Sequence, residues 1–211
     1  MKKLVLSLSV LLLPMLCMAE ITIDEAMSLM KESAGKFINA KSFTIEASVK
    51  LSISPTMNLH MYWYEDSYAL NVGSNILYYD GKSNWDCDVD SKKISIKKGK
   101  DKSADGLVTI LLMPQRLGKD MTKIDNKSFK MGKGVCTYAS EGDDVVYTMK
   151  KDGAKLTLTI NLHTKNINKI KVKKGIISTT ISYDKVQYSC SPESVVFNIK
   201  DFPGAKVKDE R

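Results

Sequence analysis

The residues of this chain that could do chemistry are few, and their spacing matches no catalytic or metal-binding motif. Its two histidines, His60 and His163, stand alone, and neither lies in an HExxH zinc motif. No GxSxG, GxGxxG or P-loop pattern occurs in the sequence. Asp86, Asp88 and Asp90 alternate, but they lack the spacing and terminal glutamate of an EF-hand loop, which favours a solvated strand face. The sequence therefore predicts no metal site and no cofactor, and we expect the protein not to be an enzyme.

The charge balance is basic, but it does not indicate a nucleic-acid-binding protein. The 211 residues include 32 lysines and arginines against 24 acidic residues, a net charge of +8. Only Arg116 and Arg211 are arginines, whereas dense phosphate recognition favours the planar fork of arginine. We therefore expect no nucleic-acid partner. The hydrophobic fraction of 43% is enough for one real core, and the low glycine and proline content excludes a disordered chain.

The N-terminus has the pattern of a secretory signal peptide. Two lysines precede the apolar run Leu4–Leu16, and a small residue, Ala19, follows at the expected cleavage position. The run is shorter than the roughly 20 residues that a transmembrane helix needs. We therefore predict a signal peptide over residues 1–19, a periplasmic location for the cleaved protein, and a single domain over residues 20–211.

The cysteines leave two questions open. Cys17 allows the alternative of a lipid-anchored protein, but the large Leu16 before it disfavours acylation. The other three, Cys87, Cys136 and Cys190, have no CxxC spacing, so a redox motif is not predicted. An odd number cannot be fully paired, and one disulfide with one free thiol remains open beside three free thiols.

Two segments have helical features. Thr22 and Glu25 form a capping box, and apolar residues then recur at helical spacing, which predicts a helix over residues 23 to 39. The apolar run Gly106–Met113 ends at Pro114. Its period does not distinguish a helix from a buried strand, but the proline stop and a polar start favour a helix.

Most of the remaining chain alternates between apolar and polar residues, which is typical of half-buried antiparallel strands. The alternating stretches are 43–53, 57–64, 68–72, 76–79, 84–89, 94–96, a stretch from 128, 145–149, 156–162, 167–172, 177–183 and 195–199. Their number and spacing predict about 10 or 11 strands joined by short turns. The fold class is therefore mainly β with helices, a meander that curls into a barrel or half-barrel. Periodicity does not tell a filled barrel from a hollow one.

Two segments resemble a known family. Tyr79–Trp85 (YDGKSNW) resembles the YDGKxxW turn of the outer-membrane lipoprotein carrier family (LolA-type proteins), and Val196–Arg211 resembles that family's C-terminal closure. The order of the predicted elements also fits. The resemblance implies an unclosed antiparallel barrel whose concave face is covered by the N-terminal helix and a mid-chain lid helix. It also implies a latch between lid and barrel, which family members build with an early-strand arginine. This sequence departs from that pattern, because neither of its arginines lies on an early strand and Lys50, which does, cannot form the same planar fork.

The resemblance further implies a carrier that shields the acyl chains of lipoproteins, or of another lipid, on the way from inner to outer membrane. Its partners would be acylated lipoproteins or lipids, an inner-membrane ABC lipoprotein exporter and, transiently, the outer membrane, and the protein would be a monomer. The residues expected to line the hollow are Phe43, Ile45, Met57, Leu59, Met61, Trp63, Leu70, Val72 and Trp85. The residues expected in the lid are Leu111, Leu112 and Met113.

Two other functions remain open at this stage. The first is a periplasmic sensor or interaction module that uses the same fold with a filled core and no lipid cargo. The second is a hydrolase with an unrecognised site around His60 or His163. Lipid retained on purification would favour the carrier, and activity lost on mutating a histidine would favour the hydrolase.

Overall fold

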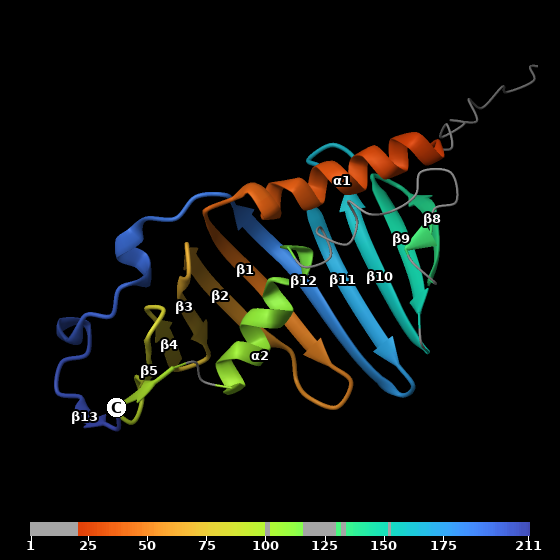
Figure 1. Ribbon diagram of the computed structural model, residues 1–211. Coiled ribbons are helices and arrows are strands. Elements are labelled where there is room, and N and C mark those ends of the chain that lie inside the picture. The colour runs from red at the N-terminus through yellow and green to blue at the C-terminus, as the bar shows by residue number, and fades with distance from the viewer. Residues whose placement is uncertain (1–20, 100–101, 116–129, 132–133, 152) are drawn as a thin grey trace, which may run out of the picture.

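The structure is a computed structural model that describes residues 21–99, 102–115, 130–131, 134–151 and 153–211 (Figure 1). The predicted signal peptide, with Cys17, and Arg116 lie outside these residues. No helix in the described part of the chain has the length and hydropathy of a membrane span.

Two α-helices form where the sequence predicts them. α1 spans Ile23–Asn39, and its capping box is present: the Thr22 hydroxyl accepts from the Glu25 backbone N–H (3.3 Å), and the Glu25 carboxylate accepts from the Thr22 backbone N–H (2.8 Å). α2 spans Lys102–Leu111, so it begins one turn before the predicted start.

The strands in the described part of the chain form one sheet of 13 strands, which confirms the predicted mainly β class with more strands than expected. The strands are β1 (Ser42–Leu51), β2 (Met57–Tyr64), β3 (Ser67–Val72), β4 (Asn75–Tyr79), β5 (Ser83–Asp88), β6 (Lys93–Lys98), β7 (Lys130–Met131), β8 (Gly134–Glu141), β9 (Asp144–Lys151), β10 (Ala154–Asn161), β11 (Ile167–Lys174), β12 (Ile177–Gln187) and β13 (Lys206–Asp209). Their spatial order is β13-β6-β5-β4-β3-β2-β1-β12-β11-β10-β9-β8-β7. Because β13 and β7 stand at opposite ends, the sheet does not close.

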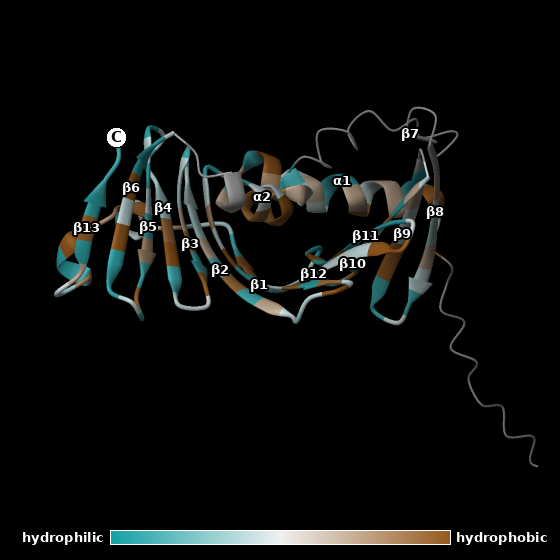
Figure 2. Ribbon diagram, turned by 90° about the horizontal axis from the view of Figure 1, so that it is seen from below, coloured by the Kyte–Doolittle hydropathy of each residue, from teal (hydrophilic) through white to brown (hydrophobic). Residues whose placement is uncertain are grey.

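The sheet consists of two meanders joined in the middle. β1–β6 form one wing and β7–β12 the other, and β1 pairs with β12 to connect them, for example at Val49 opposite Ile181. The sheet is strongly curved, and both α1 and α2 lie on its concave side (Figure 2). This arrangement confirms the predicted unclosed sheet covered by an N-terminal and a mid-chain helix.

The turn that resembles YDGKxxW is held by its own side chains. The Asp80 carboxylate accepts from the backbone N–H groups of Lys82 (2.8 Å) and Ser83 (2.7 Å), and the Tyr79 hydroxyl donates to the Gly81 carbonyl (2.8 Å). Gly81 has φ +92°, a conformation that favours glycine. The motif therefore has a local structural role in joining β4 to β5.

The predicted strand over residues 195–199 is wrong. This segment lies between two short 3₁₀ helices, Pro192–Val195 (η1) and Ile199–Asp201 (η2), and does not belong to the sheet. Its alternation reflects packing of Phe197 against the outside of the sheet instead of strand pairing. The sequence analysis also missed β13, which pairs with β6 in parallel and whose four residues are all exposed.

Candidate functional site

The apolar residues between the concave face and the helices form one buried group, here called the inner cluster. Its best-buried strand residues are Phe43, Ile45, Ala47, Val49, Leu59, Met61, Tyr68, Leu70, Val145, Tyr147, Leu158, Ile160, Ile167, Ile170 and Ile181. They come from strands of both wings, and most are less than 3% exposed. The inner cluster is therefore continuous across the concave face from β4 to β8.

A row of aromatic rings crosses the first wing within this cluster. Phe43, Trp63, Tyr68 and Tyr79 are direct cross-strand neighbours on β1, β2, β3 and β4. Phe43 and Trp63 stack with centroids 5.9 Å apart, and Trp63 stacks on Tyr68 at 6.2 Å. Phe37 of α1 meets the edge of this row at Phe43 (6.1 Å). Aromatic pairs of this kind stabilise a sheet beyond simple area burial.

α2 covers the inner cluster with one apolar face. Ala104, Val108 and Leu111 follow one another at helical spacing and are 1%, 4% and 0% exposed. The Tyr183 hydroxyl of β12 donates to the Leu111 carbonyl oxygen (3.2 Å), one of the carbonyls that a helix end leaves without an internal partner. Burial raises the pKa of Tyr183, so this phenol keeps its donor proton.

α1 is held in the same way, by a second tyrosine of the β7–β12 wing. The Tyr147 hydroxyl of β9 donates to the Ala26 carbonyl oxygen (2.7 Å), and burial raises the pKa of this phenol as well. Ala26, Met30 and Phe37 on the packed face of α1 are fully buried. Each helix therefore combines an apolar contact face with a tyrosine hydrogen bond from the sheet.

Eight of the nine predicted lining residues lie together in or against the inner cluster. Phe43, Ile45, Leu59, Met61 and Leu70 are buried members, and Met57, Trp63 and Val72 are partly buried against them. The predicted lid residues also lie here: Leu111 and Leu112 are buried, and Met113 packs against the cluster. These side chains belong to one packed group that also includes residues of α1 and α2.

The placement of Trp85 with the other eight is wrong. Trp85 faces the opposite side of the sheet, where it stacks on Phe197 with centroids 5.4 Å apart. It belongs to a second group, here called the outer cluster, which comprises Ile76, Tyr78, Trp85, Cys87, Ile94, Ile96, Phe197, Phe202 and Ala205. On β5 the side that continues the concave face carries Asn84, Asp86 and Asp88 instead.

Four buried tyrosines of the inner cluster, Tyr68, Tyr79, Tyr147 and Tyr183, are among the residues that the sequence analysis did not assign to the site. Tyr68 lies two positions before Leu70 and therefore on its face, so the alternation could have identified it. Tyr147 and Tyr183 also lie on the buried face of their strands, but their bonds to α1 and α2 depend on where the helices lie over the sheet. No short-range signal indicates them.

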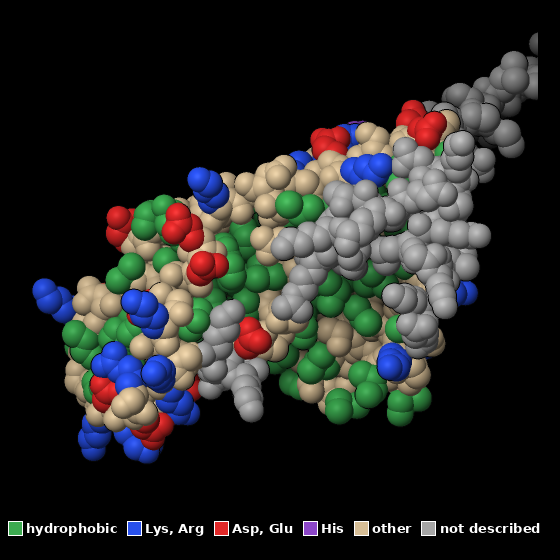
Figure 3. Space-filling model, viewed as in Figure 1, with side chains coloured by type: hydrophobic (Ala, Val, Ile, Leu, Met, Phe, Trp, Pro, Cys, Tyr) green, Lys and Arg blue, Asp and Glu red, His purple; other side chains and the backbone are tan. Residues whose placement is uncertain are grey.

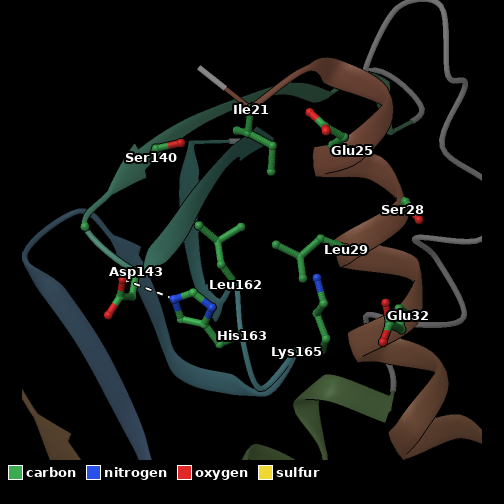
Figure 4. A pocket seen from close by; sticks show the side chains of 11 residues that line it. Ile21, Glu25, Ser28, Leu29, Glu32, Ser140, Asp143, Leu162, His163 and Lys165 are labelled. Carbon is green, nitrogen blue, oxygen red and sulfur yellow. Dashed lines mark hydrogen bonds and ion pairs between the residues drawn. The ribbon is translucent and has the colours of Figure 1, made fainter. Parts of the chain in front are cut away.

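A separate cleft of about 510 Å³ lies beside the first turns of α1 (Figure 4). It contains His163, whose Nε2 lies 3.3 Å from the Asp143 carboxylate, and both side chains are 74% exposed. Ser140 also lines the cleft, but its hydroxyl and the imidazole do not point toward one another in Figure 4. A nucleophile and its base must be within hydrogen-bonding distance, so this arrangement does not favour the hydrolase alternative.

Metal-ligating and thiol groups do not gather into a site in the described part of the chain. No group of three or more His, Cys, Asp or Glu residues there could hold a metal ion. Cys87, Cys136 and Cys190 are all free thiols, so the open question of a disulfide is answered in favour of three free thiols. Burial raises the pKa of Cys87 and of Cys136 to about 12, which keeps both thiols protonated and unreactive.

No family model matches the sequence, and no curated protein matches it. Among solved structures, LprF from Mycobacterium bovis is similar, with 11% identity, a TM-score of 0.49, and coverage of 82% of this chain and 98% of that one. An uncharacterized conserved protein from Thermus thermophilus has 7% identity, a TM-score of 0.47, and coverage of 88% and 99%. The LolA superfamily protein NE2245 from Nitrosomonas europaea has 8% identity, a TM-score of 0.36, and coverage of 83% and 98%. At these identities the likenesses concern overall fold alone.

Proposed function

We propose that this protein is an exported carrier that shields the acyl chains of lipoproteins, or of another lipid, between its sheet and its helices. The observation that carries the proposal is the inner cluster, which extends over both wings of the concave face and is covered by α2. A curved, unclosed sheet covered by a separate helix can present an apolar surface without breaking any strand pairing. That is the property a reversible lipid shelter needs.

The exchange of α2 for an acyl chain is close to balanced in free energy. Each methylene exposed to water costs about 0.8 kcal/mol, so an acylated lipoprotein needs a shelter outside the membrane. Withdrawal of Val108 and Leu111 exposes strand residues that an acyl chain then covers again. Met27, Met30 and Met61 are buried in the cluster, and flexible methionine side chains adapt to cargo of different shape. Such a carrier holds cargo loosely enough to pass it on.

The direction of transport and the location rest on sequence features. The signal-peptide pattern at residues 1–19 supports export to the periplasm, and the two segments that resemble lipoprotein carriers support receipt from an inner-membrane ABC exporter and delivery to the outer membrane. N-terminal sequencing of the protein from a periplasmic extract should give Glu20 as the first residue. A protein retained with its leader, or acylated at Cys17, would contradict this part of the proposal.

The two tryptophans of the chain offer a direct test, because one lies in each cluster. Trp85→Phe leaves Trp63 as the only tryptophan, and Trp63→Phe leaves Trp85 as the only tryptophan; excitation at wavelengths that tyrosine does not absorb isolates each signal. A brominated fatty acid quenches tryptophan only at close range. We expect it to quench Trp63 strongly and saturably, and to leave Trp85 unquenched.

Equal quenching of both tryptophans, or of neither, would contradict the proposal. Trp63→Asp should abolish acyl binding because it places a charge in the middle of the aromatic row. Trp85→Asp is the matched control, since it disturbs the outer cluster instead. Unfolding curves of both variants separate lost binding from lost folding, and mass spectrometry of lipid extracted from the purified protein identifies natural cargo.

A second candidate function is an interaction module of the same fold with no lipid cargo. The observation in its favour is the closure of the inner cluster, where Phe43, Ile45 and Met61 have 0% exposure. This function predicts that purified protein contains no lipid and that both single-tryptophan variants ignore the brominated fatty acid. The same experiment therefore decides between the two functions.

A further inference from the structure

Three isoleucines stand almost fully exposed at one tip of the molecule. Ile53 lies in the β1–β2 turn and is 95% exposed, and Ile176 and Ile177 lie at the β11–β12 turn and are 94% and 68% exposed. β11 ends at Lys174 and β12 begins at Ile177, so only Gly175 and Ile176 form the turn. Turn positions of this kind are usually polar. We call these three residues the isoleucine tip.

The two turns are held side by side, so the isoleucines form one surface. The Ser52 backbone N–H donates to the Ser178 carbonyl oxygen (2.9 Å), and the Ser52 hydroxyl contacts the same oxygen (3.0 Å). Gly175 has φ +60°, which favours glycine and fixes a tight turn. Hydrophobic side chains gather at this lower edge of the molecule in Figure 3, below the strands labelled β1 and β12 in Figure 1. The tip is therefore preformed and convex.

Lysines flank the isoleucine tip on the neighbouring strands. Lys150, Lys155 and Lys173 are direct cross-strand neighbours on β9, β10 and β11. The next row contains Lys171 and Lys50, both opposite Thr180. All five lysines are exposed, and their described register partners in these two rows, other lysines apart, are Val135, Ser178 and threonines, with no carboxylate among them. Like charges directly opposite one another destabilise a sheet, so folding alone does not account for these lysine rows.

We infer that the isoleucine tip and the lysine rows form a docking surface for a membrane of anionic phospholipid. The lysines match negatively charged headgroups, and such attraction acts at short range and is screened by salt. The isoleucines then insert between the headgroups, as apolar side chains of peripheral proteins do. Three convex side chains offer too little area for a stable protein interface, which buries about 800 Å² on each partner. A bilayer needs no complementary pocket.

This inference rests on the proposed function in one respect: it gives the carrier its place of contact with a membrane. The inner cluster opens between the sheet and α2, on the concave side, whereas the lysine rows lie on the convex side next to the turns. The two surfaces therefore use different residues. Membrane docking and acyl binding can be lost separately.

Vesicle binding tests the inference. The protein that begins at Glu20 is suitable for this experiment, because all described helices and strands and all members of the inner cluster lie after that residue. We expect it to co-sediment with vesicles that contain phosphatidylglycerol, to bind vesicles of phosphatidylcholine alone far more weakly, and to be released by salt. The triple variant Ile53→Ser, Ile176→Ser, Ile177→Ser should bind these vesicles at least about tenfold more weakly than wild type, because it loses three side chains that could insert into the membrane.

Two further variants keep the test specific. Val196→Ser, Ile199→Ser, Val207→Ser is the matched control: it removes three exposed apolar residues elsewhere and should bind like wild type. The double variant Lys155→Gln, Lys173→Gln should weaken vesicle binding about tenfold at low salt, because it removes two positive charges that face the headgroups. It should nevertheless raise the melting temperature, because the repulsion between two directly opposite lysines is removed. Weaker binding with higher stability excludes misfolding as the cause.

The inference is overturned if the isoleucine variant binds vesicles as tightly as wild type, or if its control loses binding equally. It is also overturned if sedimentation shows a dimer that the isoleucine variant abolishes, since the tip would then contact a second copy. Quenching of Trp63 by the brominated fatty acid is measured in the same variants. Loss of vesicle binding with unchanged quenching separates this surface from the proposed acyl site.

Discussion

The inner and outer clusters lie on opposite faces of one sheet, and they differ in what covers them. The inner cluster is covered by α1 and α2, each held by a tyrosine hydrogen bond. The outer cluster is smaller and is covered by the C-terminal segment, whose Phe197 and Phe202 stack on one another over Tyr78 and Trp85. The segment ends in β13, which pairs with β6. The C-terminal segment is therefore hydrogen-bonded to the edge of the sheet through β13, whereas α1 and α2 lie on the concave face.

β4 is the strand where the apolar side of the sheet changes. Leu77 and Tyr79 point to the inner cluster, whereas Ile76 and Tyr78 point to the outer cluster. Beyond this strand the concave side carries charged residues on β5. A cover that is paired with a strand edge is therefore suited to permanent closure. A cover that lies on an apolar face can leave without disturbing the ladder.

The greatest loss of stability should come from a phenylalanine in the cover of the inner cluster. Phe37 of α1 is fully buried against Phe43, Tyr183 and Tyr188, so Phe37→Ala should lower the free energy of unfolding by about 3–5 kcal/mol. Phe202 in the other cover is only partly buried, and Phe202→Ala should cost about 1–2 kcal/mol. Urea unfolding measures both. Equal losses would mean that the two covers contribute alike.

An intermediate effect concerns one buried thiol in each cluster. Cys87 belongs to the outer and Cys136 to the inner cluster, and burial raises the pKa of each to about 12. The unfolded chain releases these protons near pH 8.5, whereas the folded chain keeps them. The thiols' contribution to stability is therefore complete below pH 8.5 and is lost as pH rises toward 12, by up to about 1.4 kcal/mol per pH unit for each thiol.

Thiol labelling then distinguishes the two covers. In a Cys190→Ser background, Phe202→Ala should speed labelling of Cys87 and leave Cys136 protected, because it loosens only the outer cover. An added fatty acid that displaces α2 should change labelling of Cys136 alone. Unfolding curves at increasing pH test the predicted loss of stability. A free energy of unfolding that stays constant above pH 9 would contradict the buried, protonated state of both thiols.

A still smaller change should come from one glycine substitution in each cover, with opposite sign. Gly106 lies inside α2, and a Cβ there would meet nothing within 4 Å, so Gly106→Ala should stabilise the helix by about 1 kcal/mol. Gly204 in the C-terminal segment has φ +77°, and Gly204→Ala should destabilise by about 1 kcal/mol. Thermal unfolding measures both signs. A stabilised α2 should also slow fatty-acid entry if that helix must withdraw.

Short-range patterns predicted most of the fold. The capping box at Thr22 and Glu25 predicts α1 because its two hydrogen bonds are local. Alternation predicts β1 and β2, since one face of each is buried and the other is solvated. The 195–199 stretch was misassigned because a segment that packs on a face and a strand that pairs at an edge share the same alternation. β13 was missed because all four of its residues are exposed.

The candidate site was predictable only in part, for the same reason. Eight of the nine expected lining residues share one face through strict alternation along β1, β2 and β3. Trp85 was misplaced because β4 carries apolar or aromatic residues on both faces. The sequence of β4 therefore does not show which residues of β5 lie on the concave face. The carrier function and the membrane surface remain proposals that the single-tryptophan and vesicle experiments address.

Hydrophobic period, capping and turn chemistry act within a few residues, so the order of amino acids alone specifies the elements, their amphipathic faces and the tight turns. Three features arise only in the folded chain: β1 pairs with β12, Tyr147 and Tyr183 hold the two helices, and Ile53 lies beside Ile176. These contacts join residues that are far apart in the chain. Their selection depends on how a curved sheet brings its two wings together, which no local pattern encodes.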